Sequence, residues 1–281
     1  ATPHGNTLTT EFSKAAILGE KLGMDSITDF LAVSYSTPDM IGHAYGPNSV
    51  EVEDCYLRLD KELGAFFDFL DQHVGKGQYL VFLSADHGAA HVPGFMKENK
   101  LSAGFIDDQK LNDRLNAELK TQFGVDNLSL GLVNFQVVLN IPAIDRAKNV
   151  READVSARAI SWLEKQEGIL RAFRLDALKQ TTLPKTLSDR VANGYYPARN
   201  GHIQVVFKPG YLEGFLTGGT THGVWYPYDA HIPLLWYGWK IPAGNSHRTV
   251  SMADIAPTIA ALLNIQEPNG SIGNVIQEII K

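Results

Sequence analysis

Apolar residues follow two different spacings in the first part of the chain. Residues 30–35 and 79–84 are short, nearly unbroken apolar runs rich in β-branched and aromatic side chains, which is typical of buried parallel strands. Between them, apolar side chains recur at helical spacing from Ser49 to about residue 73. This order predicts a β-α-β unit, whose two strands lie parallel in one sheet as neighbours or near-neighbours.

A helix is also predicted near the start of the chain. Thr9 or Thr10 is a suitable N-cap, and apolar positions that include Phe12 and Leu18 continue at helical spacing to about Leu22. We expect Phe12 and Leu18 to face the core.

The middle of the chain departs from this alternation. Between residues 92 and 199 the apolar spacing is weak and turn residues are frequent, which indicates an α+β insertion. Apolar runs at residues 202–207 and 232–237 then predict a return to the core. The sequence therefore predicts an α/β fold with a mostly parallel sheet and helices on both faces, formed by residues 1–91 and 200–281. Residues 92–199 form the inserted α+β subdomain.

Composition narrows the classes of function. The 281 residues are 44% hydrophobic and 20% charged, as in an ordinary globular protein. The formal net charge is −6 and no Lys/Arg cluster occurs, so a nucleic-acid partner is not expected. No apolar run approaches the roughly 20 residues that span a bilayer, and Cys55 is the single cysteine. Neither a membrane span nor an intrachain disulfide is predicted.

Five side chains that can bind metal follow predicted strands or lie in a glycine-rich loop. Asp86 and His87 directly follow the second strand, at the edge where open α/β sheets bind their ligands. Asp39 and His43 follow the first strand and, four residues apart, share a face of one helical turn. His222 lies in the glycine-rich loop. Two carboxylates and three imidazoles are ligands that zinc favours, so their joint placement predicts a metal site.

Other polar residues are weaker candidates. His91 could contact substrate, although a hydrogen bond to backbone is the more ordinary role of a loop histidine. Asp229 and His231 could orient His222 from outside the ligand shell, or could form an ordinary polar turn. Four hydroxyl side chains next to the ligand candidates are conceivable but disfavoured nucleophiles. They are Ser36, Thr37, Thr220 and Thr221.

The motifs around these residues resemble those of a known family. The matching segments are residues 36–43, 46–47, 84–88, 219–223 and 252–259. Together they resemble the alkaline phosphatase superfamily, in the branch with the type I phosphodiesterases/nucleotide pyrophosphatases and the monomeric, phosphate-irrepressible bacterial alkaline phosphatases. Residues 46–54 and 86–91 favour the bacterial phosphatases. The resemblance runs along nearly the whole chain and is loose only in the middle insertion.

This resemblance implies a zinc-dependent phosphoric ester hydrolase. In such enzymes two zinc ions about 4 Å apart clamp a phosphoryl transfer, and one of them activates a Thr or Ser nucleophile. Asp39, His43 and His222 resemble the ligands of one zinc ion, and Asp86 and His87 resemble two ligands of the other. A phosphate ester is the implied substrate. A periplasmic or extracellular location is implied by the resemblance alone.

One part of the family pattern has no counterpart here. The nucleophile and a further Asp ligand precede the first matched motif in the family, but only 38 residues precede Asp39, and they contain no plausible strand followed by Asp or by a Thr-Asn pair. The chain also begins at Ala1 without Met. We therefore expect the C-terminal part of a phosphatase that lacks its nucleophile and is inactive or weakly active alone. We also expect it to self-associate through an exposed apolar face or sheet edge.

Two alternatives stay open. A phosphodiesterase or nucleotide pyrophosphatase of the same superfamily shares the Asp/His framework and differs in the groups around the non-transferred phosphate oxygens. A non-catalytic metal-binding domain is the alternative from another class, and it has to account for all five candidate ligands. The physiological substrate is not named by the sequence.

Overall fold

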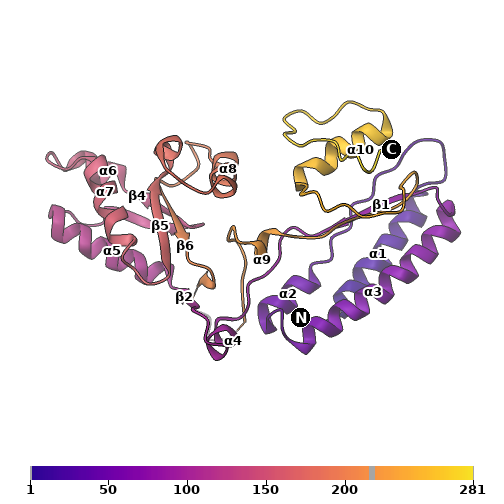
Figure 1. Ribbon diagram of the computed structural model, residues 1–281, viewed down its shortest axis with the longest axis horizontal. Helices are drawn as coiled ribbons and strands as arrows, with labels where there is room; N and C mark the ends of the chain where they lie inside the picture. Colours follow the sequence, from indigo (N-terminus) through magenta and orange to yellow (C-terminus); the bar gives the residue numbers. More distant parts are fainter. Residues whose placement is uncertain (1, 215–218, 281) are drawn as a thin grey trace. The chain divides into compact units, whose positions relative to one another are not determined.

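The computed structural model describes residues 2–214 and 219–280, which divide into two compact units. The first unit comprises Pro38–Asp54 and His87–His231, and the second comprises Thr2–Thr37, Cys55–Asp86 and Ile232–Lys281. Their helices and strands carry the labels of Figure 1. Within the described ranges, none of the helices combines the length and apolar character that crossing a membrane requires.

The second unit holds long helices and one antiparallel strand pair. Its elements are α1 (His4–Glu20), most of α3 (Val50–Leu70), the π-helical turn η1 (Asp71–Gly75), β1 (Leu80–Ser84), β8 (Leu234–Gly238), the 3₁₀ turn η3 (Met252–Asp254) and α10 (Ile255–Leu263). β1 and β8 pair with Leu80 opposite Gly238. A small core that includes Ile17, Phe66 and Leu70 packs α1 against α3.

An antiparallel sheet with flanking helices is the main part of the first unit. The strand order is β3 (Ser129–Val133), β4 (Gln136–Leu139), β6 (Ile203–Phe207) and β5 (Ile169–Arg174). The other elements are α2 (Thr37–Tyr45), α4 (Pro93–Glu98), β2 (Gly104–Ile106), α5 (Asp108–Phe123), α6 (Ile141–Arg146), α7 (Glu152–Leu163), the 3₁₀ turn η2 (Leu175–Gln180), α8 (Lys185–Gly194), β7 (Tyr211–Glu213) and α9 (Pro227–Ala230). β2 and β7 form a short parallel pair.

The core of the first unit lies between this sheet and the helices α5 and α7. Leu111, Leu115 and Leu119 recur at helical spacing on α5 and are buried. The Asp107 side chain caps the start of α5, and Gly124 ends it in the left-handed conformation with φ of 69°. Capping, spacing and burial all favour the same helix here, which makes it a well-determined element.

The expected mixture of helices and strands is confirmed, and the helix expected from Ser49 forms as α3 and η1. The expected strand neighbours were wrong. Residues 30–35 pair with no strand among the described residues, and β1 pairs with β8 in antiparallel register. β6 forms where a strand was expected but pairs with β4 and β5, so the chain does not rejoin a parallel sheet there. A run of apolar residues indicates that a segment is buried. It does not indicate which strand the segment pairs with, and strand order depends on that pairing.

The bounds of the two compact units differ from those of the predicted core and insertion. That division, with residues 1–91 and 200–281 as core and 92–199 as insertion, stays a prediction. It concerns domain organisation, which the local contacts of each unit do not test.

Helix α1 buries the opposite face from the one expected. Phe12 and Leu18 are 76% and 55% exposed. The buried residues are Asn6, Thr10, Ser13 and Ile17. Polar groups are buried here because they find partners: the Thr10 and Tyr35 hydroxyls lie 3.0 Å apart, and the Asn6 amide donates to Cys55 Sγ at 3.6 Å.

We expect Leu119→Ala to destabilise the first unit by about 2–5 kcal/mol, because the side chain is fully buried and its truncation leaves a cavity. Leu130→Ala on β3 is the control. Its side chain is 57% exposed, so the free energy of unfolding should change by less than about 0.5 kcal/mol. Denaturant unfolding followed by circular dichroism measures both variants. Equal losses would contradict the assignment of this core.

Candidate metal centre

Helix α2 presents a carboxylate and an imidazole on one face. Asp39 and His43 lie one helical turn apart, and Asp39 Oδ2 is 3.4 Å from His43 Nε2. Asp39 is in the first turn, where the helix dipole favours a negative charge. The two side chains are 40% and 38% exposed, so a ligand can reach them.

A glycine-rich turn brings His222 to this pair. Gly219 has φ of +77°, and a Cβ there would lie 2.2 Å from the His43 carbonyl oxygen, so only glycine fits. The close approach lets the Thr220 N–H donate to the His43 carbonyl at 3.1 Å. In return, His43 Nδ1 donates to the Thr220 carbonyl at 2.8 Å. His222 Nε2 consequently lies 3.6 Å from Asp39 Oδ1.

A third segment, which follows β1, adds another imidazole. The buried Thr220 hydroxyl donates to the Ala90 carbonyl at 2.6 Å, which joins this segment to the glycine-rich turn. His87 Nε2 lies 3.9 Å from Asp39 Oδ1, and its ring stacks on that of His222 with centroids 3.3 Å apart. The Thr220 hydroxyl is thus buried and bonded to a backbone acceptor.

The hydrogen bonds of His43 and His87 fix which ring nitrogen carries the proton. A carbonyl oxygen only accepts, so His43 Nδ1 is the donor to Thr220 and His87 Nδ1 is the donor to Gly88 at 2.8 Å. In the neutral rings Nε2 is then unprotonated, and both Nε2 atoms face the Asp39 carboxylate. Lone pairs directed at a carboxylate are unfavourable, and a cation bound between them removes the repulsion.

The donor set fits a divalent metal ion. One ligand atom each of Asp39, His43 and His222 lie within 4.8 Å of one another. Zinc bonds to such oxygen and nitrogen atoms are about 2.0–2.2 Å long, so tetrahedral neighbours lie about 3.4 Å apart. The observed separations are similar, although they involve different oxygens: 3.4 Å from Asp39 Oδ2 to His43 Nε2 and 3.6 Å from Asp39 Oδ1 to His222 Nε2. Burial, followed by the charge of His87, lowers the pKa of His222, which favours the neutral form that binds metal.

Three other candidates are exposed to solvent. Asp86 is exposed directly after β1 and belongs to the second unit. His91 is exposed, and its Nδ1 lies 2.7 Å from Asn48 Oδ1. His231 is exposed, and its backbone N–H donates to the Pro227 carbonyl at 2.9 Å. The structure therefore brings Asp39, His43, His87 and His222 together, and bonds His91 and His231 elsewhere.

Asp229 is buried, with 3% of its surface exposed. Its Oδ2 accepts from the Val224 N–H at 2.8 Å, and its carbonyl accepts from the Gly88 N–H at 2.7 Å. The backbone framework built by Gly88, Gly219 and Thr220 was not anticipated from the sequence. A glycine beside each ligand histidine was the available signal, because such a residue permits close approach of two backbones.

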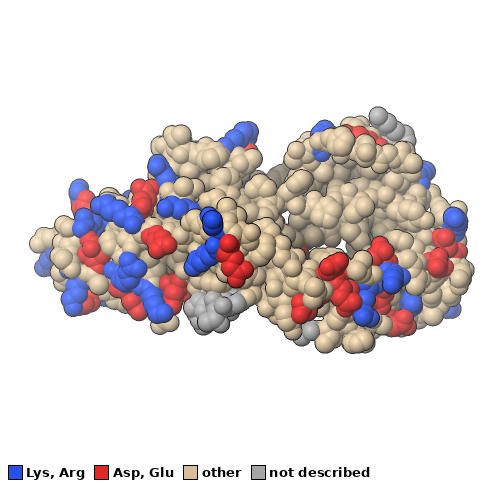
Figure 2. All heavy atoms as spheres, turned by 60° about the horizontal axis from the view of Figure 1, so that its bottom comes forward, with Lys and Arg blue, Asp and Glu red and all other residues tan. Residues whose placement is uncertain are grey.

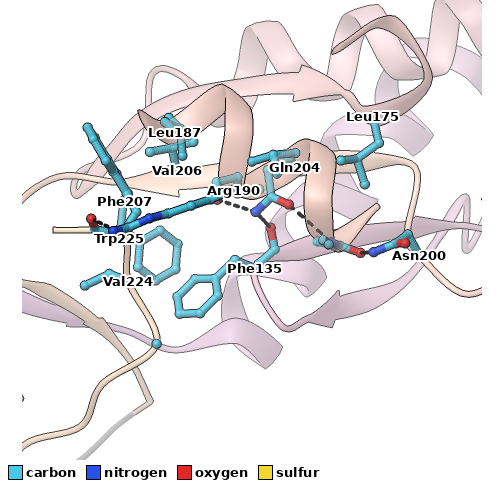
Figure 3. A pocket seen from close by; sticks show the side chains of 15 residues that line it. Phe135, Leu175, Leu187, Arg190, Asn200, Gln204, Val206, Phe207, Val224 and Trp225 are labelled. Atoms are coloured by element: carbon cyan, nitrogen blue, oxygen red, sulfur yellow. Dashed lines mark hydrogen bonds between the residues drawn. The ribbon is translucent and has the colours of Figure 1, made fainter. Parts of the chain in front are cut away.

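A cavity of about 290 Å³ borders the loop after His222, and none of its lining residues is a candidate ligand. Aromatic rings of Phe135, Phe207 and Trp225 lie on one side of it (Figure 3). Arg190 from α8 donates to the Trp225 carbonyl at 2.7 Å, and the Gln204 amide donates to the Phe135 carbonyl at 3.1 Å. These polar groups are bonded within the wall and do not extend the metal centre.

The chain matches one family profile and several individual proteins. The family is described as type I phosphodiesterase/nucleotide pyrophosphatase, and residues 3–223 match it. The chain is 47% identical over 280 residues to alkaline phosphatase PafA of Elizabethkingia meningoseptica, which covers 99% of this chain and 51% of that protein. It is 46% identical over 284 residues to a protein of Myroides odoratus named calcium-transporting ATPase, covering 100% of this chain and 52% of the other.

Alkaline phosphatase PhoV of Synechococcus elongatus is 45% identical over 279 residues, covering 99% of this chain and 50% of PhoV. The crystal structure of wild-type alkaline phosphatase PafA matches this chain with a TM-score of 0.95 and 46% identity, over 100% of this chain and 53% of that one. The likeness confirms the α/β fold of the alkaline phosphatase type. The chain spans about half the length of the curated relatives it matches.

We expect Gly219→Ala to lower the free energy of unfolding by about 1–3 kcal/mol, because the new Cβ would overlap the His43 carbonyl in a left-handed backbone. Gly42→Ala is the matched control within α2. A Cβ at Gly42 meets no atom within 4 Å, so this change should raise stability by about 0.5–1 kcal/mol. Urea titration without metal measures both. A Gly219→Ala variant as stable as the control would show that the turn does not depend on this close approach.

Proposed function

The chain belongs to the type I phosphodiesterase/nucleotide pyrophosphatase family, and from this premise we propose that it is the C-terminal part of a zinc-dependent phosphatase. The complete enzyme would hydrolyse phosphate monoesters. The observation that carries the proposal is the group of imidazole nitrogens around Asp39: those of His43, His222 and His87 lie 3.4, 3.6 and 3.9 Å from its carboxylate oxygens.

Two zinc ions are proposed for the complete enzyme. Asp39, His43 and His222 would hold one of them, and Asp86 and His87 would contribute to the other. Bound zinc offsets the charge of a phosphate ester and lowers the pKa of a bound hydroxyl or water. The residues of this chain supply the orientation. The Thr220 carbonyl fixes the His43 ring, and the Gly88 carbonyl fixes the His87 ring.

The nucleophile is proposed to be a Thr or Ser outside this chain. The coverage of about half of each relative supports this proposal. Within the chain, the Thr220 hydroxyl is buried and bonded to the Ala90 carbonyl. We therefore propose that the chain alone is inactive or weakly active. A periplasmic or extracellular location of the complete protein is part of the same proposal and rests on the family resemblance.

The surface charge disfavours a nucleic-acid partner. Basic and acidic side chains are intermixed on the face shown in Figure 2. The net charge is −6, whereas nucleic-acid backbones are bound through clustered positive charge. We therefore propose no nucleic-acid partner. The proposed phosphate ester substrate rests on the family match.

The family description and the relatives' names keep other phosphoric substrates in consideration. The family name includes phosphodiesterases and nucleotide pyrophosphatases, and one relative is named as an ATPase. The complete enzyme should therefore be assayed with a monoester, a diester and ATP. A higher specificity constant for the diester or for ATP would favour the alternative activity, and no turnover of any of them would favour a non-catalytic metal-binding domain.

We expect the chain to bind about one zinc ion after zinc loading and gel filtration, and Asp39→Ala to weaken that binding by at least about 100-fold, since it removes a direct ligand. Elemental mass spectrometry gives the stoichiometry and chelator competition gives the affinity. The complete enzyme should hydrolyse a phosphomonoester, and the same substitution should abolish this activity.

The chain by itself is the control for the missing nucleophile, because we expect it to bind zinc without appreciable turnover. Robust zinc-dependent hydrolysis by the isolated chain, lost in Asp39→Ala, would place the nucleophile within these residues. Thr37 and Thr221 would then be the candidates to test.

We expect the chain to self-associate through the exposed face of α1, where Leu8, Phe12 and Leu18 are 73%, 76% and 55% exposed. Light scattering after size exclusion should show a mass that rises with concentration, and Phe12→Ser should reduce the effect. Leu101→Ser is the control, because Leu101 is similarly exposed, at 54%, but lies in the first unit. A monomer at all concentrations would refute self-association.

A further inference from the structure

Asp229 forms hydrogen bonds with two loop segments, one that follows His222 and one that follows His87. Its Oδ2 accepts from the Val224 N–H at 2.8 Å, two residues after His222. Its carbonyl accepts from the Gly88 N–H at 2.7 Å, one residue after His87. A Cβ at Gly88 would lie 2.1 Å from the Tyr228 carbonyl oxygen, so the two backbones are in direct contact. One buried residue therefore controls the position of two imidazoles.

Two complementary groups are left without partners at this place. Asp229 Oδ1 is buried and has no hydrogen-bond partner among the described residues. Among the described residues, His222 Nδ1 also has no hydrogen-bond partner. His43 Nδ1 and His87 Nδ1, in contrast, each donate to a backbone carbonyl. An unpartnered carboxylate oxygen and an unpartnered ring nitrogen thus belong to residues that interact electrostatically.

The charge environment agrees with this pairing. Burial raises the pKa of Asp229, and hydrogen bonds from Val224 and Gly223, together with the charges of His222 and His87, oppose that rise. The buried carboxylate is therefore within electrostatic range of both imidazoles. Burying a carboxylate oxygen without a hydrogen bond costs free energy. Accepting a hydrogen bond from His222 would remove this cost.

We propose that Asp229 is the positioning residue of the metal centre: its Oδ1 accepts the proton of His222 Nδ1 when His222 Nε2 binds a metal ion. The inference rests on the proposed metal-binding function of the same site. The pairing holds His222 in the tautomer with an unprotonated Nε2 and raises the basicity of that nitrogen. The Oδ2 and carbonyl bonds of Asp229 hold the two loops in register.

Asp229→Asn tests the proposal with little change in shape. The amide oxygen can still accept from Val224, but the negative charge next to His222 is lost. We expect the zinc affinity of the chain, measured by competition with a chromophoric chelator, to fall about 10–100-fold. In ¹⁵N-labelled, zinc-loaded wild-type chain we expect the His222 signals of a ring protonated at Nδ1.

Asp254→Asn is the matched control. Asp254 is also buried, at 6% exposed, and also accepts two backbone N–H groups, from Ser251 and Asn274, each at 2.8 Å. It belongs to the second unit, and among the described residues its carboxylate is bonded to Ser251 and Asn274, neither of which is a candidate ligand. This variant should lose stability in the same way while its zinc affinity changes less than about 2-fold.

The outcomes separate the two levels of inference. A wild-type chain that binds no zinc would overturn the proposed metal centre itself. A wild-type chain that binds zinc, with Asp229→Asn binding equally well, would overturn the positioning role alone. If Asp229→Asn does not fold, the wild-type nuclear magnetic resonance measurement decides: a zinc-loaded His222 ring protonated at Nε2 would also overturn the role.

Discussion

A carboxylate surrounded by unprotonated nitrogens is the constraint on which the rest of the site depends. Nε2 atoms of His43, His87 and His222 lie 3.4, 3.9 and 3.6 Å from the oxygens of Asp39. Two of these rings have used their Nδ1 protons on backbone carbonyls, so their neutral forms have no proton to give to Asp39. In these neutral forms the fold holds acceptors against an acceptor, an arrangement that a bound cation relieves. Such rigid placement before the ion binds is what a precise metal site requires.

Backbone contacts supply that rigidity. The turn before His222 and helix α2 are joined by a reciprocal pair of bonds between Thr220 and His43. This pairing needs glycine at residue 219, because a Cβ there would lie 2.2 Å from the His43 carbonyl. The loop after His87 is joined to Asp229 in a similar way, with glycine at residue 88. Since the main chain carries these contacts, small residues beside the ligands are as important to the geometry as the ligands themselves.

The sequence predicted features that depend on local spacing. Asp39 and His43 could be placed on one face because four residues separate them in a helix. The contact of His43 with Thr220 crosses 177 residues and carries no local signal. Partner choice also explains the wrong strand neighbours: residues 30–35 are apolar, but apolar character does not identify a hydrogen-bonding partner. The buried face of α1 was missed for the same reason, since the burial of Thr10 depends on a bond to Tyr35.

Some of the chain's departures from local preference lie beside the loop that carries His222. Gly223, its neighbour, has φ of +112°, and a Cβ there would lie 3.3 Å from the ring of Phe135. Phe135 itself has φ of 61°, an unfavourable conformation for a bulky aromatic residue. Asp229 Oδ1 is buried without a partner in the described chain, at a cost of about 1–3 kcal/mol for such a group. Strained or unsatisfied groups persist where the surrounding structure enforces them, and they cluster at functional sites. The left-handed Phe135 and the unpartnered Asp229 Oδ1 both lie beside the loop that carries His222, which favours a role for them in holding this ligand.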